Sequence, residues 1–280
     1  MRVITSNARI LALLGNPIDH SLSPVIQNAA LRETGMDGIY VSLRCEEQYL
    51  MQFMHSLVRS GGGGNITIPH KEKAVSLLDE YSEAVERTGA CNTFWGIDGK
   101  IYGDNTDVEG FRRALRYFLG ESPKGLKVLL VGAGGAARAV LVALLDDGVE
   151  DVLILNRSTE RAQAVVRLIG GERVRVAESY LDIRDNNFDL VVNATSLGIG
   201  LEDKLPVDLS KMASVGLVMD LVCRTGTTPF VKSAEDLGIR AMDGREMLIQ
   251  QGSVAFERWW KKPGPVEIMR CSLVDTVTNK

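Results

Sequence analysis

The feature that most constrains the fold is a glycine-rich segment at residues 132–137, with the sequence GAGGAA. An apolar run at 128–131 precedes it and predicts a buried strand, and residues 138–145 follow it and predict a helix. In such a turn the first glycine permits the tight bend, and the second lets the backbone approach a pyrophosphate at the helix N-terminus. The segment therefore predicts a dinucleotide-binding site made by Gly132, Ala133, Gly134, Gly135 and Ala136.

The end of the next predicted strand, residues 152–155, indicates which dinucleotide is bound. An NAD site normally has an acidic residue here, because a carboxylate accepts a hydrogen bond from the ribose 2′-OH and repels a 2′-phosphate. This chain has Asn156, Arg157 and Ser158 instead, with Arg161 one helical turn further on. A guanidinium pairs with a phosphate through two parallel hydrogen bonds. The sequence therefore predicts an NADP-dependent redox enzyme.

Length and composition exclude several other classes of protein. A chain of 280 residues favours two domains, and 45% hydrophobic with 24% charged residues is typical of a globular protein. A net charge of −4 gives no basic surface for nucleic acid. The apolar run at 10–14 is too short to cross a bilayer, so we expect no membrane partner and a cytoplasmic location. None of the 4 cysteines and 3 histidines lies at metal-ligand spacing, and no metal site is expected.

Strands and helices are predicted to alternate along both halves, which indicates an α/β fold with mostly parallel sheets. The first half has expected strands at 10–15, 38–43, 65–68, 91–95 and 100–103, and expected helices at 24–34, 46–59, 71–81 and 107–119. The second half has expected strands at 128–131, 152–155, 173–176, 190–192 and 217–221, and final helices at 246–260 and 266–277. Asp98-Gly99 predicts a hairpin turn, and the glycine run 61–64 predicts a flexible turn.

Short polar motifs follow the predicted strands of the first half, at residues 20–24, 65–71, 89–93 and 103–107. Ligands of parallel sheets bind beyond the carboxyl ends of the strands, so we expect these motifs to converge. They supply hydroxyls, amides, a lysine and carboxylates, which suits a small polyhydroxylated acid. Singly they also have structural explanations, since serines and aspartate often cap helices. Their joint occurrence favours a site.

In order and spacing, these motifs and those at 193–196, 247–248 and Gln251 resemble the shikimate dehydrogenase family. The resemblance implies two α/β domains with the active site in the cleft between them. The substrate domain would comprise residues 1–107 plus 244–280, so that the C-terminal helices return to it. A Rossmann-type NADP-binding domain would comprise residues 108–243.

The resemblance also implies the chemistry, which is the reversible NADPH-dependent reduction of 3-dehydroshikimate to shikimate in the chorismate pathway to aromatic amino acids. The protein would be a monomer or a homodimer with small-molecule ligands and no nucleic-acid partner. Lys71 and Asp107 would be the acid–base pair at the reacting hydroxyl, and which of them takes the proton is left open. The substrate would be bound by Ser21, Ser23, Thr67, Lys71, Asn92, Asp107 and Gln251. NADP would be bound by the glycine turn, by Asn156, Arg157, Ser158 and Arg161 at the 2′-phosphate, and by Thr195, Leu221, Gly244 and Met247.

Some positions depart from the family pattern. Cys223 stands where the family commonly has tyrosine, and Leu197 stands where a small residue is frequent. A paralogue that acts on quinate or an aminated shikimate is therefore an alternative. The nucleotide-binding half alone also resembles glutamyl-tRNA reductase, although the nucleophilic cysteine and tRNA-binding surface of that enzyme are not evident. A catalytically silent NADP-binding sensor is a third alternative, against which the presence of both Lys71 and Asp107 argues.

Overall fold

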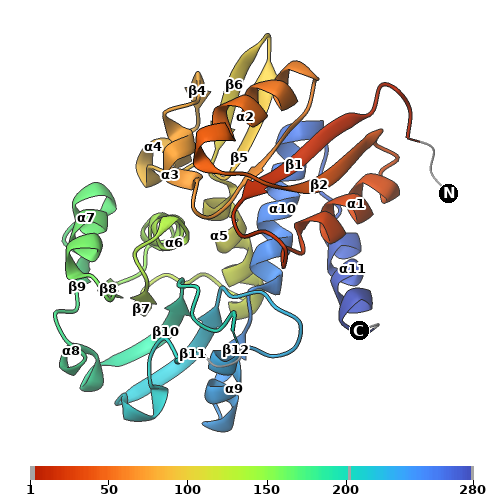
Figure 1. The fold of residues 1–280 in the computed structure, drawn as a ribbon. Coiled ribbons are helices and arrows are strands. Elements are labelled where there is room, and N and C mark those ends of the chain that lie inside the picture. Colours follow the sequence, from red (N-terminus) through yellow and green to blue (C-terminus); the bar gives the residue numbers. More distant parts are fainter. Residues whose placement is uncertain (1–3, 201–202, 279–280) are drawn as a thin grey trace. The chain divides into compact units, whose positions relative to one another are not determined.

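The computed structural model describes residues 4–200 and 203–278, so the extreme ends of the predicted substrate domain lie outside the described residues. The chain divides into two compact units (Figure 1). Unit 1 is Met1–Gly110 with Leu248–Lys280, and unit 2 is Phe111–Met247. Each unit contains one six-stranded sheet with helices, which confirms the predicted α/β class. No helix in the described part of the chain is long and apolar enough to cross a membrane.

The sheet of unit 1 has the strand order β2-β1-β3-β5-β6-β4. Its strands are β1 Arg9–Gly15, β2 Gly38–Arg44, β3 Gly63–Ile66, β4 Glu80–Tyr81, β5 Thr93–Ile97 and β6 Lys100–Asp104. β1 is parallel to β2 and β3, and β4 is parallel to β6, whereas β5 is antiparallel to both of its neighbours. The predicted hairpin joins β5 to β6, with Asp98 and Gly99 both at positive φ (51° and 80°). The sheet is thus mostly parallel, with one antiparallel strand at the hairpin.

The prediction of a flexible turn at the glycine run 61–64 is wrong for Gly63 and Gly64, which belong to β3. A Cβ atom on Gly64 would lie 2.0 Å from the Ala12 carbonyl oxygen, and one on Gly63 would lie 2.5 Å from the Phe94 carbonyl oxygen. The two glycines are needed because the backbones of β1 and β5 approach β3 from both sides. The absence of a side chain, and not flexibility, therefore explains Gly63 and Gly64.

The helices of unit 1 are α1 Ser23–Glu33, α2 Leu50–Arg59 after a 3₁₀ turn at Glu47–Tyr49, α3 Lys71–Val75, α4 Glu83–Thr88, the first turn of α5 Thr106–Leu119, α10 Arg245–Trp260 from Leu248 onward, and α11 Val266–Thr278. The expected helix at 71–81 is wrong beyond Val75. The chain there turns to pair with β6, where the Ile101 N–H donates to the Asp79 carboxylate (2.7 Å) and the Asp79 N–H donates to the Ile101 carbonyl. These bonds replace the hydrogen bonds that a longer α3 would have made.

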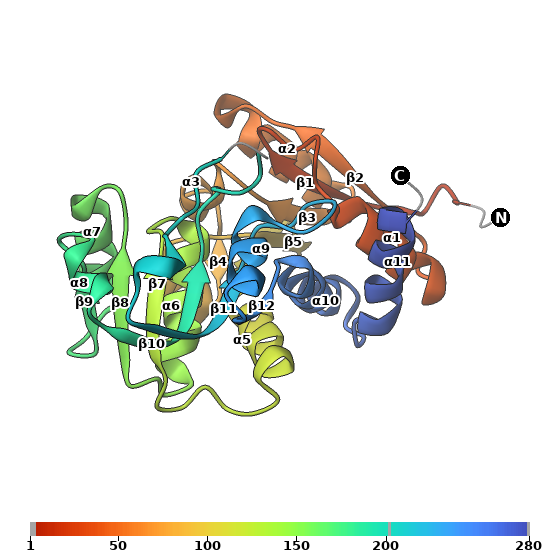
Figure 2. The same cartoon turned by 90° about the horizontal axis from the view of Figure 1, so that it is seen from below.

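The C-terminal helices complete the core of unit 1. Figures 1 and 2 show α11 beside α1, and these two helices are in contact. Phe256 and Trp259 of α10 and Met269 of α11 are buried in one cluster with Leu11, Ile26 and Tyr40. The Trp259 indole N–H donates to the Phe94 carbonyl (3.2 Å). The first segment of the chain therefore buries its apolar surface against the last.

Unit 2 is a doubly wound parallel sheet with the order β12-β11-β10-β7-β8-β9. Its strands are β7 Lys127–Val131, β8 Asp151–Leu155, β9 Val174–Val176, β10 Asn187–Asn193, β11 Ser214–Asp220 and β12 Arg240–Met242. Its further helices are α6 Gly135–Asp146, α7 Thr159–Ile169, α8 Leu181–Arg184 and α9 Pro229–Asp236, with a 3₁₀ turn at Leu209–Lys211. This order is that of the Rossmann fold, as predicted, and its switch point lies between β7 and β10.

Candidate active site

Lys71 and Asp107 form an ion pair in unit 1. Lys71 is the first residue of α3 and Asp107 is the second residue of α5, and each helix follows a strand of the sheet. The Lys71 Nζ donates to the Asp107 Oδ2 at 2.6 Å, and the two side chains are 18% and 8% exposed. Asp107 lies inside its helix, and the Asn105 side-chain oxygen accepts the Asp107 N–H (3.3 Å). The carboxylate is thus not used as a helix cap and is available for chemistry.

Asn92 fixes the orientation of Asp107. Its Nδ2 donates to the Asp107 Oδ1 (2.8 Å), and its Oδ1 accepts the backbone N–H of Thr106 (2.8 Å). Because a backbone N–H can only donate, the second bond decides which end of the amide faces Asp107. Each oxygen of the Asp107 carboxylate therefore accepts one hydrogen bond, from Asn92 or from Lys71, and keeps a lone pair for a ligand.

A further residue of this cluster, Asn65, was not among the predicted site residues. Its Nδ2 donates to the Asn92 carbonyl (3.1 Å) and to the Thr93 hydroxyl (2.8 Å), and its Oδ1 accepts from the Tyr40 hydroxyl (2.8 Å). Asn65 and Thr93 face each other in the β3–β5 register. The sequence signal for Asn65 was its place as a polar residue at the end of a predicted strand.

The other predicted substrate residues lie in unit 1 as follows. Ser21 and Ser23 are at the start of α1, and the Ser21 hydroxyl accepts the Ser23 N–H (3.2 Å). The methyl group of Thr67 lies over Gly15, where a Cβ atom would come within 2.3 Å of it. Gln251 is on α10, and its Nε2 donates to the Leu248 carbonyl (2.8 Å). Hydrogen bonds thus join Lys71, Asn92 and Asp107 directly. None of the bonds described here joins Ser21, Ser23, Thr67 or Gln251 to that group.

In unit 2, the glycine turn has the backbone that a phosphate site needs. Gly132 has φ +119°, and a Cβ atom there would lie 3.0 Å from the Ala194 carbonyl oxygen. Gly134 precedes α6, and nothing lies within 4 Å of the place where its Cβ would be. Ala137 of α6 is fully buried. The open backbone at Gly134 and the N-terminus of α6 fit the pyrophosphate of a dinucleotide.

The loop after β8 carries the residues predicted to select the dinucleotide. The Asn156 Nδ2 donates to the Ser158 carbonyl (2.8 Å), and the Ser158 hydroxyl accepts the Arg161 N–H (3.3 Å) and so caps α7. Arg157 and Arg161 are exposed, and within residues 4–200 and 203–278 neither side chain forms an ion pair. The loop is therefore ordered by Asn156 and Ser158, and both guanidinium groups are available to an anion.

A buried polar network orders the ends of β10 and β11. Asp220 is fully buried and accepts hydrogen bonds from the Asn193 Nδ2 (2.8 Å), the Thr228 hydroxyl (2.6 Å) and the Val222 N–H (3.1 Å). Burial raises the pKa of Asp220, and these hydrogen bonds oppose the rise. The Asn193 Oδ1 accepts from both the N–H and the hydroxyl of Thr195 (3.0 and 2.7 Å). Asn193 and Asp220, which were not among the predicted site residues, thus hold the segments that carry Thr195 and Leu221.

Two more residues of unit 2 bear on the predicted cofactor surface. A Cβ atom on Gly244 would lie 2.3 Å from the Leu221 carbonyl oxygen, so only glycine fits there, and Met247 is 7% exposed.

Cys223 is a free thiol of intermediate exposure, and burial raises its pKa to about 12. It is therefore an uncharged group and a weak hydrogen-bond donor.

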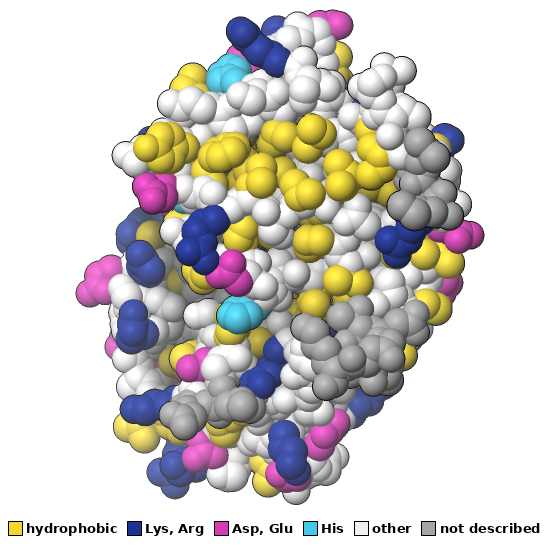
Figure 3. All heavy atoms as spheres, turned by 45° about the vertical axis from the view of Figure 1, so that its right-hand side comes forward, with side chains coloured by type: hydrophobic (Ala, Val, Ile, Leu, Met, Phe, Trp, Pro, Cys, Tyr) yellow, Lys and Arg dark blue, Asp and Glu magenta, His cyan; other side chains and the backbone are white. Residues whose placement is uncertain are grey.

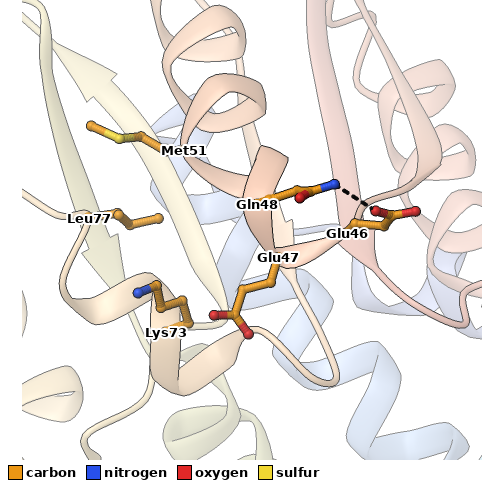
Figure 4. Close-up of a pocket in the computed structure, with 6 residues that line it drawn as sticks. All are labelled: Glu46, Glu47, Gln48, Met51, Lys73 and Leu77. Carbon is orange, nitrogen blue, oxygen red and sulfur yellow. Dashed lines mark hydrogen bonds between the residues drawn. The ribbon is translucent and has the colours of Figure 1, made fainter.

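A separate surface pocket of about 620 Å³ opens in unit 1 beside α2 and α3 (Figure 4). It is lined by Glu46, Glu47, Gln48, Met51, Lys73 and Leu77, none of which was predicted as a site residue.

Across the described ranges, no group of three or more His, Cys, Asp and Glu side chains could hold a metal ion.

Comparisons with known proteins agree with the family that the sequence resembles. Residues 13–94 match the model of the shikimate dehydrogenase substrate-binding domain, and residues 116–204 match the model of shikimate/quinate 5-dehydrogenase. The shikimate dehydrogenase (NADP⁺) of Geobacter sulfurreducens is 38% identical over 278 residues, which cover 96% of this chain and 97% of the relative.

Solved structures extend the agreement to the fold. The shikimate dehydrogenase of Aquifex aeolicus superposes with a TM-score of 0.88 at 30% identity, covering 97% of this chain and 99% of that one. The shikimate 5-dehydrogenase of Thermus thermophilus, solved with NADP(H) and shikimate, gives a TM-score of 0.85 at 34% identity over 94% and 97% of the two chains. The chain therefore belongs to the shikimate dehydrogenase family.

Proposed function

We propose that this protein catalyses the reversible NADPH-dependent reduction of 3-dehydroshikimate to shikimate. The observation that carries the proposal is the Lys71–Asp107 ion pair, in which Asn92 orients the carboxylate. Family membership supports shikimate as the substrate, because relatives that match nearly the whole chain are NADP⁺-dependent shikimate dehydrogenases. The place of the reaction in the formation of chorismate and the aromatic amino acids follows from that substrate.

Unit 1 supplies the groups that recognise the substrate. We assign the carboxylate to the hydroxyls of Ser21 and Ser23, which lie at the N-terminus of α1, where free N–H groups favour an anion. We assign the ring hydroxyls to Thr67, Asn92 and Gln251. These side chains are neutral donors and acceptors, which suits hydroxyl groups. Lys71 is then left for the reacting oxygen.

The Lys71–Asp107 pair supplies the proton of the reaction. When NADPH is bound, it provides the hydride that reduces the ketone carbon. As the C–H bond forms, the carbonyl oxygen gains charge, and the Lys71 ammonium donates a proton to it while Asp107 holds the amine in place. In the reverse direction the pair takes the proton from the hydroxyl.

Unit 2 supplies the groups for NADP. We assign the pyrophosphate to the backbone of Gly132, Ala133, Gly134, Gly135 and Ala136. The adenosine 2′-phosphate is assigned to Asn156, Arg157, Ser158 and Arg161, and the remainder of the cofactor to Thr195, Leu221, Gly244 and Met247. The open backbone at Gly134 and the two guanidinium groups after β8 support these roles.

The direct test is the formation of NADPH, followed by absorbance, from shikimate and NADP⁺. The wild-type protein should be active, and Lys71→Ala should lose turnover by roughly 10²–10⁴-fold while KM for shikimate changes far less. Lys73→Ala, on the same helix but exposed, is the matched control and should retain turnover. Turnover of Lys71→Ala within a few-fold of wild type would remove Lys71 from the chemistry.

Quinate is the second candidate substrate, because the matched family model covers both shikimate and quinate enzymes and because Cys223 replaces a common tyrosine. Parallel assays with quinate and with NAD⁺ separate the alternatives. A preference for quinate over shikimate would favour the quinate alternative. Binding of NADPH without any turnover would instead favour a sensor.

We propose a monomer or a homodimer, with no nucleic-acid and no membrane partner. In the space-filling view, hydrophobic side chains form a band across the upper part of one face (Figure 3). Exposed apolar surface of this kind often marks an interface, so sedimentation of the protein at two concentrations would distinguish the two states. A cytoplasmic location, expected from the sequence, stays a prediction.

A further inference from the structure

Tyr40 is a fully buried tyrosine of β2 whose hydroxyl lies in the interior of unit 1. The residue is 1% exposed, and its ring contacts Trp259 at a centroid distance of 6.0 Å. A hydroxyl buried so deeply needs a hydrogen-bond partner, and the Asn65 Oδ1 provides one at 2.8 Å. Burial raises the pKa of Tyr40 well above its ordinary value, and a hydrogen bond with the Ser23 side chain opposes the rise. The hydroxyl therefore stays protonated.

The direction of the hydrogen bonds around Tyr40 follows from its neighbours. The Asn65 Nδ2 faces the Asn92 carbonyl (3.1 Å), which can only accept, so the Asn65 Oδ1 must face Tyr40. The Tyr40 hydroxyl must then donate its single proton to Asn65. Its oxygen remains free to accept a second hydrogen bond.

From Asn65 the hydrogen bonds continue to the catalytic pair. The Asn65 Nδ2 donates to the Thr93 hydroxyl (2.8 Å), and the Thr93 hydroxyl donates to the Asn92 Oδ1 (2.9 Å). Asn92 then donates to Asp107, which holds Lys71. Asn65, Asn92, Thr93 and Asp107 are all buried, so water cannot replace a missing member of this chain without a change of structure.

We propose that Tyr40 is a positioning residue, whose hydroxyl holds the Asn65 amide and thereby sets the orientation of Asn92 and Asp107 for the reaction. This inference rests on the proposed function of the Lys71–Asp107 pair.

The test is a double-mutant cycle in the full-length protein, with Tyr40→Phe and Thr93→Val. Each change removes one hydroxyl and keeps the shape of the side chain. Each single substitution should lower kcat by about tenfold, because the loss of one buried hydrogen bond loosens the whole series of hydrogen bonds from Tyr40 to Asp107. The kcat of the double variant should be no lower than the kcat of the less active single variant, because both hydroxyls act along one path. Thr93→Ser, which keeps the hydroxyl, should restore most of kcat.

Two controls separate positioning from simple loss of stability. Tyr102→Phe removes a hydroxyl from β6 of the same sheet, where the ring stacks on Trp95, and should leave kcat unchanged. NADPH binding, followed by its fluorescence, should be the same in every variant, because the changes lie in unit 1.

The outcomes are distinct. If Tyr40→Phe and Thr93→Val lower only the unfolding temperature and leave kcat intact, or if their effects on kcat simply multiply, the inference is overturned. If Tyr40→Phe does not fold, Thr93→Val and Thr93→Ser decide whether the chain orients Asn92, and an unchanged kcat in Thr93→Val contradicts the proposal. A wild-type protein without shikimate-dependent turnover would mean that the proposed function had failed instead.

Discussion

Arg157 lies in the loop before α7, and the carboxylate of Glu160 lies in the first turn of that helix, so single residues set the charge near a bound 2′-phosphate. Ser158 donates to the Glu160 carboxylate (2.8 Å) and lowers the pKa of that group, which keeps it ionised beside the arginines. We predict that Arg157→Glu lowers kcat/KM for NADP⁺ by about 10- to 100-fold, because a charge-assisted hydrogen bond to phosphate is replaced by repulsion. Activity with NAD⁺, which has no 2′-phosphate, should change by only a few-fold.

The measurement is kcat/KM for both cofactors at one ionic strength. Arg167→Glu, in the last turn of α7, is the matched control for the change in net charge and should leave the NADP⁺/NAD⁺ ratio as it is. Equal losses with the two cofactors in Arg157→Glu would mean that Arg157 does not contact the 2′-phosphate.

Residues with their own motif could be predicted from the sequence, and residues that depend on strand register could not. Lys71, Asn92 and Asp107 lie in short polar motifs at strand ends, and the structure joins them by hydrogen bonds. Tyr40 reaches Asn65 only because β1 lies between β2 and β3 in one particular register. An apolar strand that contains one tyrosine does not reveal that register, so the buried hydroxyl had no signal of its own.

Two helices of unit 1 meet at a glycine, and this contact places Gln251. A Cβ atom on Gly110 of α5 would lie 2.5 Å from the Gln251 Cβ atom of α10. We predict that Gly110→Ala pushes α10 away from the first turn of α5, which carries Asp107, and raises KM for shikimate severalfold. Overpacking of this kind costs about 1–3 kcal/mol in unfolding free energy.

Steady-state kinetics and thermal unfolding of Gly110→Ala would check both effects. Gly171→Ala serves as the control, since nothing lies within 4 Å of the place where its Cβ would be, and it should change neither quantity. A Gly110→Ala protein with an unaltered KM would show that Gln251 does not bind the substrate or that the helices adjust without moving it.

Elements with a strong local pattern were predicted closely, and elements defined by their neighbours were not. The hairpin of β5 and β6 and the strand–turn–helix at β7 and α6 carry their signals in a few adjacent residues. By contrast, β4 and β12 are two and three residues long, and each exists because it pairs with an edge of a sheet formed elsewhere in the chain. Short edge strands of this kind have little periodicity from which to predict them.

At the scale of the whole molecule, the chain order makes the two units depend on different parts of the sequence. Unit 2 is one continuous stretch, Phe111–Met247, with its own buried cluster that includes Phe230 and Val218. Unit 1 is formed by two stretches separated by all of unit 2, and Phe256 and Trp259 from the second stretch complete the core of the first. Two domains could be predicted from the chain length alone. That the core of unit 1 depends on the second stretch became clear only from the packing of α10 and α11.

A matched pair of core substitutions tests whether the units are separable in stability. Phe256 and Phe230 are both fully buried, in unit 1 and unit 2 respectively, and each change to alanine should cost its own unit about 3–5 kcal/mol. Hydrogen exchange should then show Phe256→Ala losing protection in residues 4–110 and 248–278, with NADPH binding retained. Phe230→Ala should lose protection in residues 111–200 and 203–247 and lose NADPH binding, while β1 to β6 stay protected. Loss of protection throughout the chain in both variants would mean that the two units unfold as one cooperative body, in which case the binding of either ligand would stabilise both.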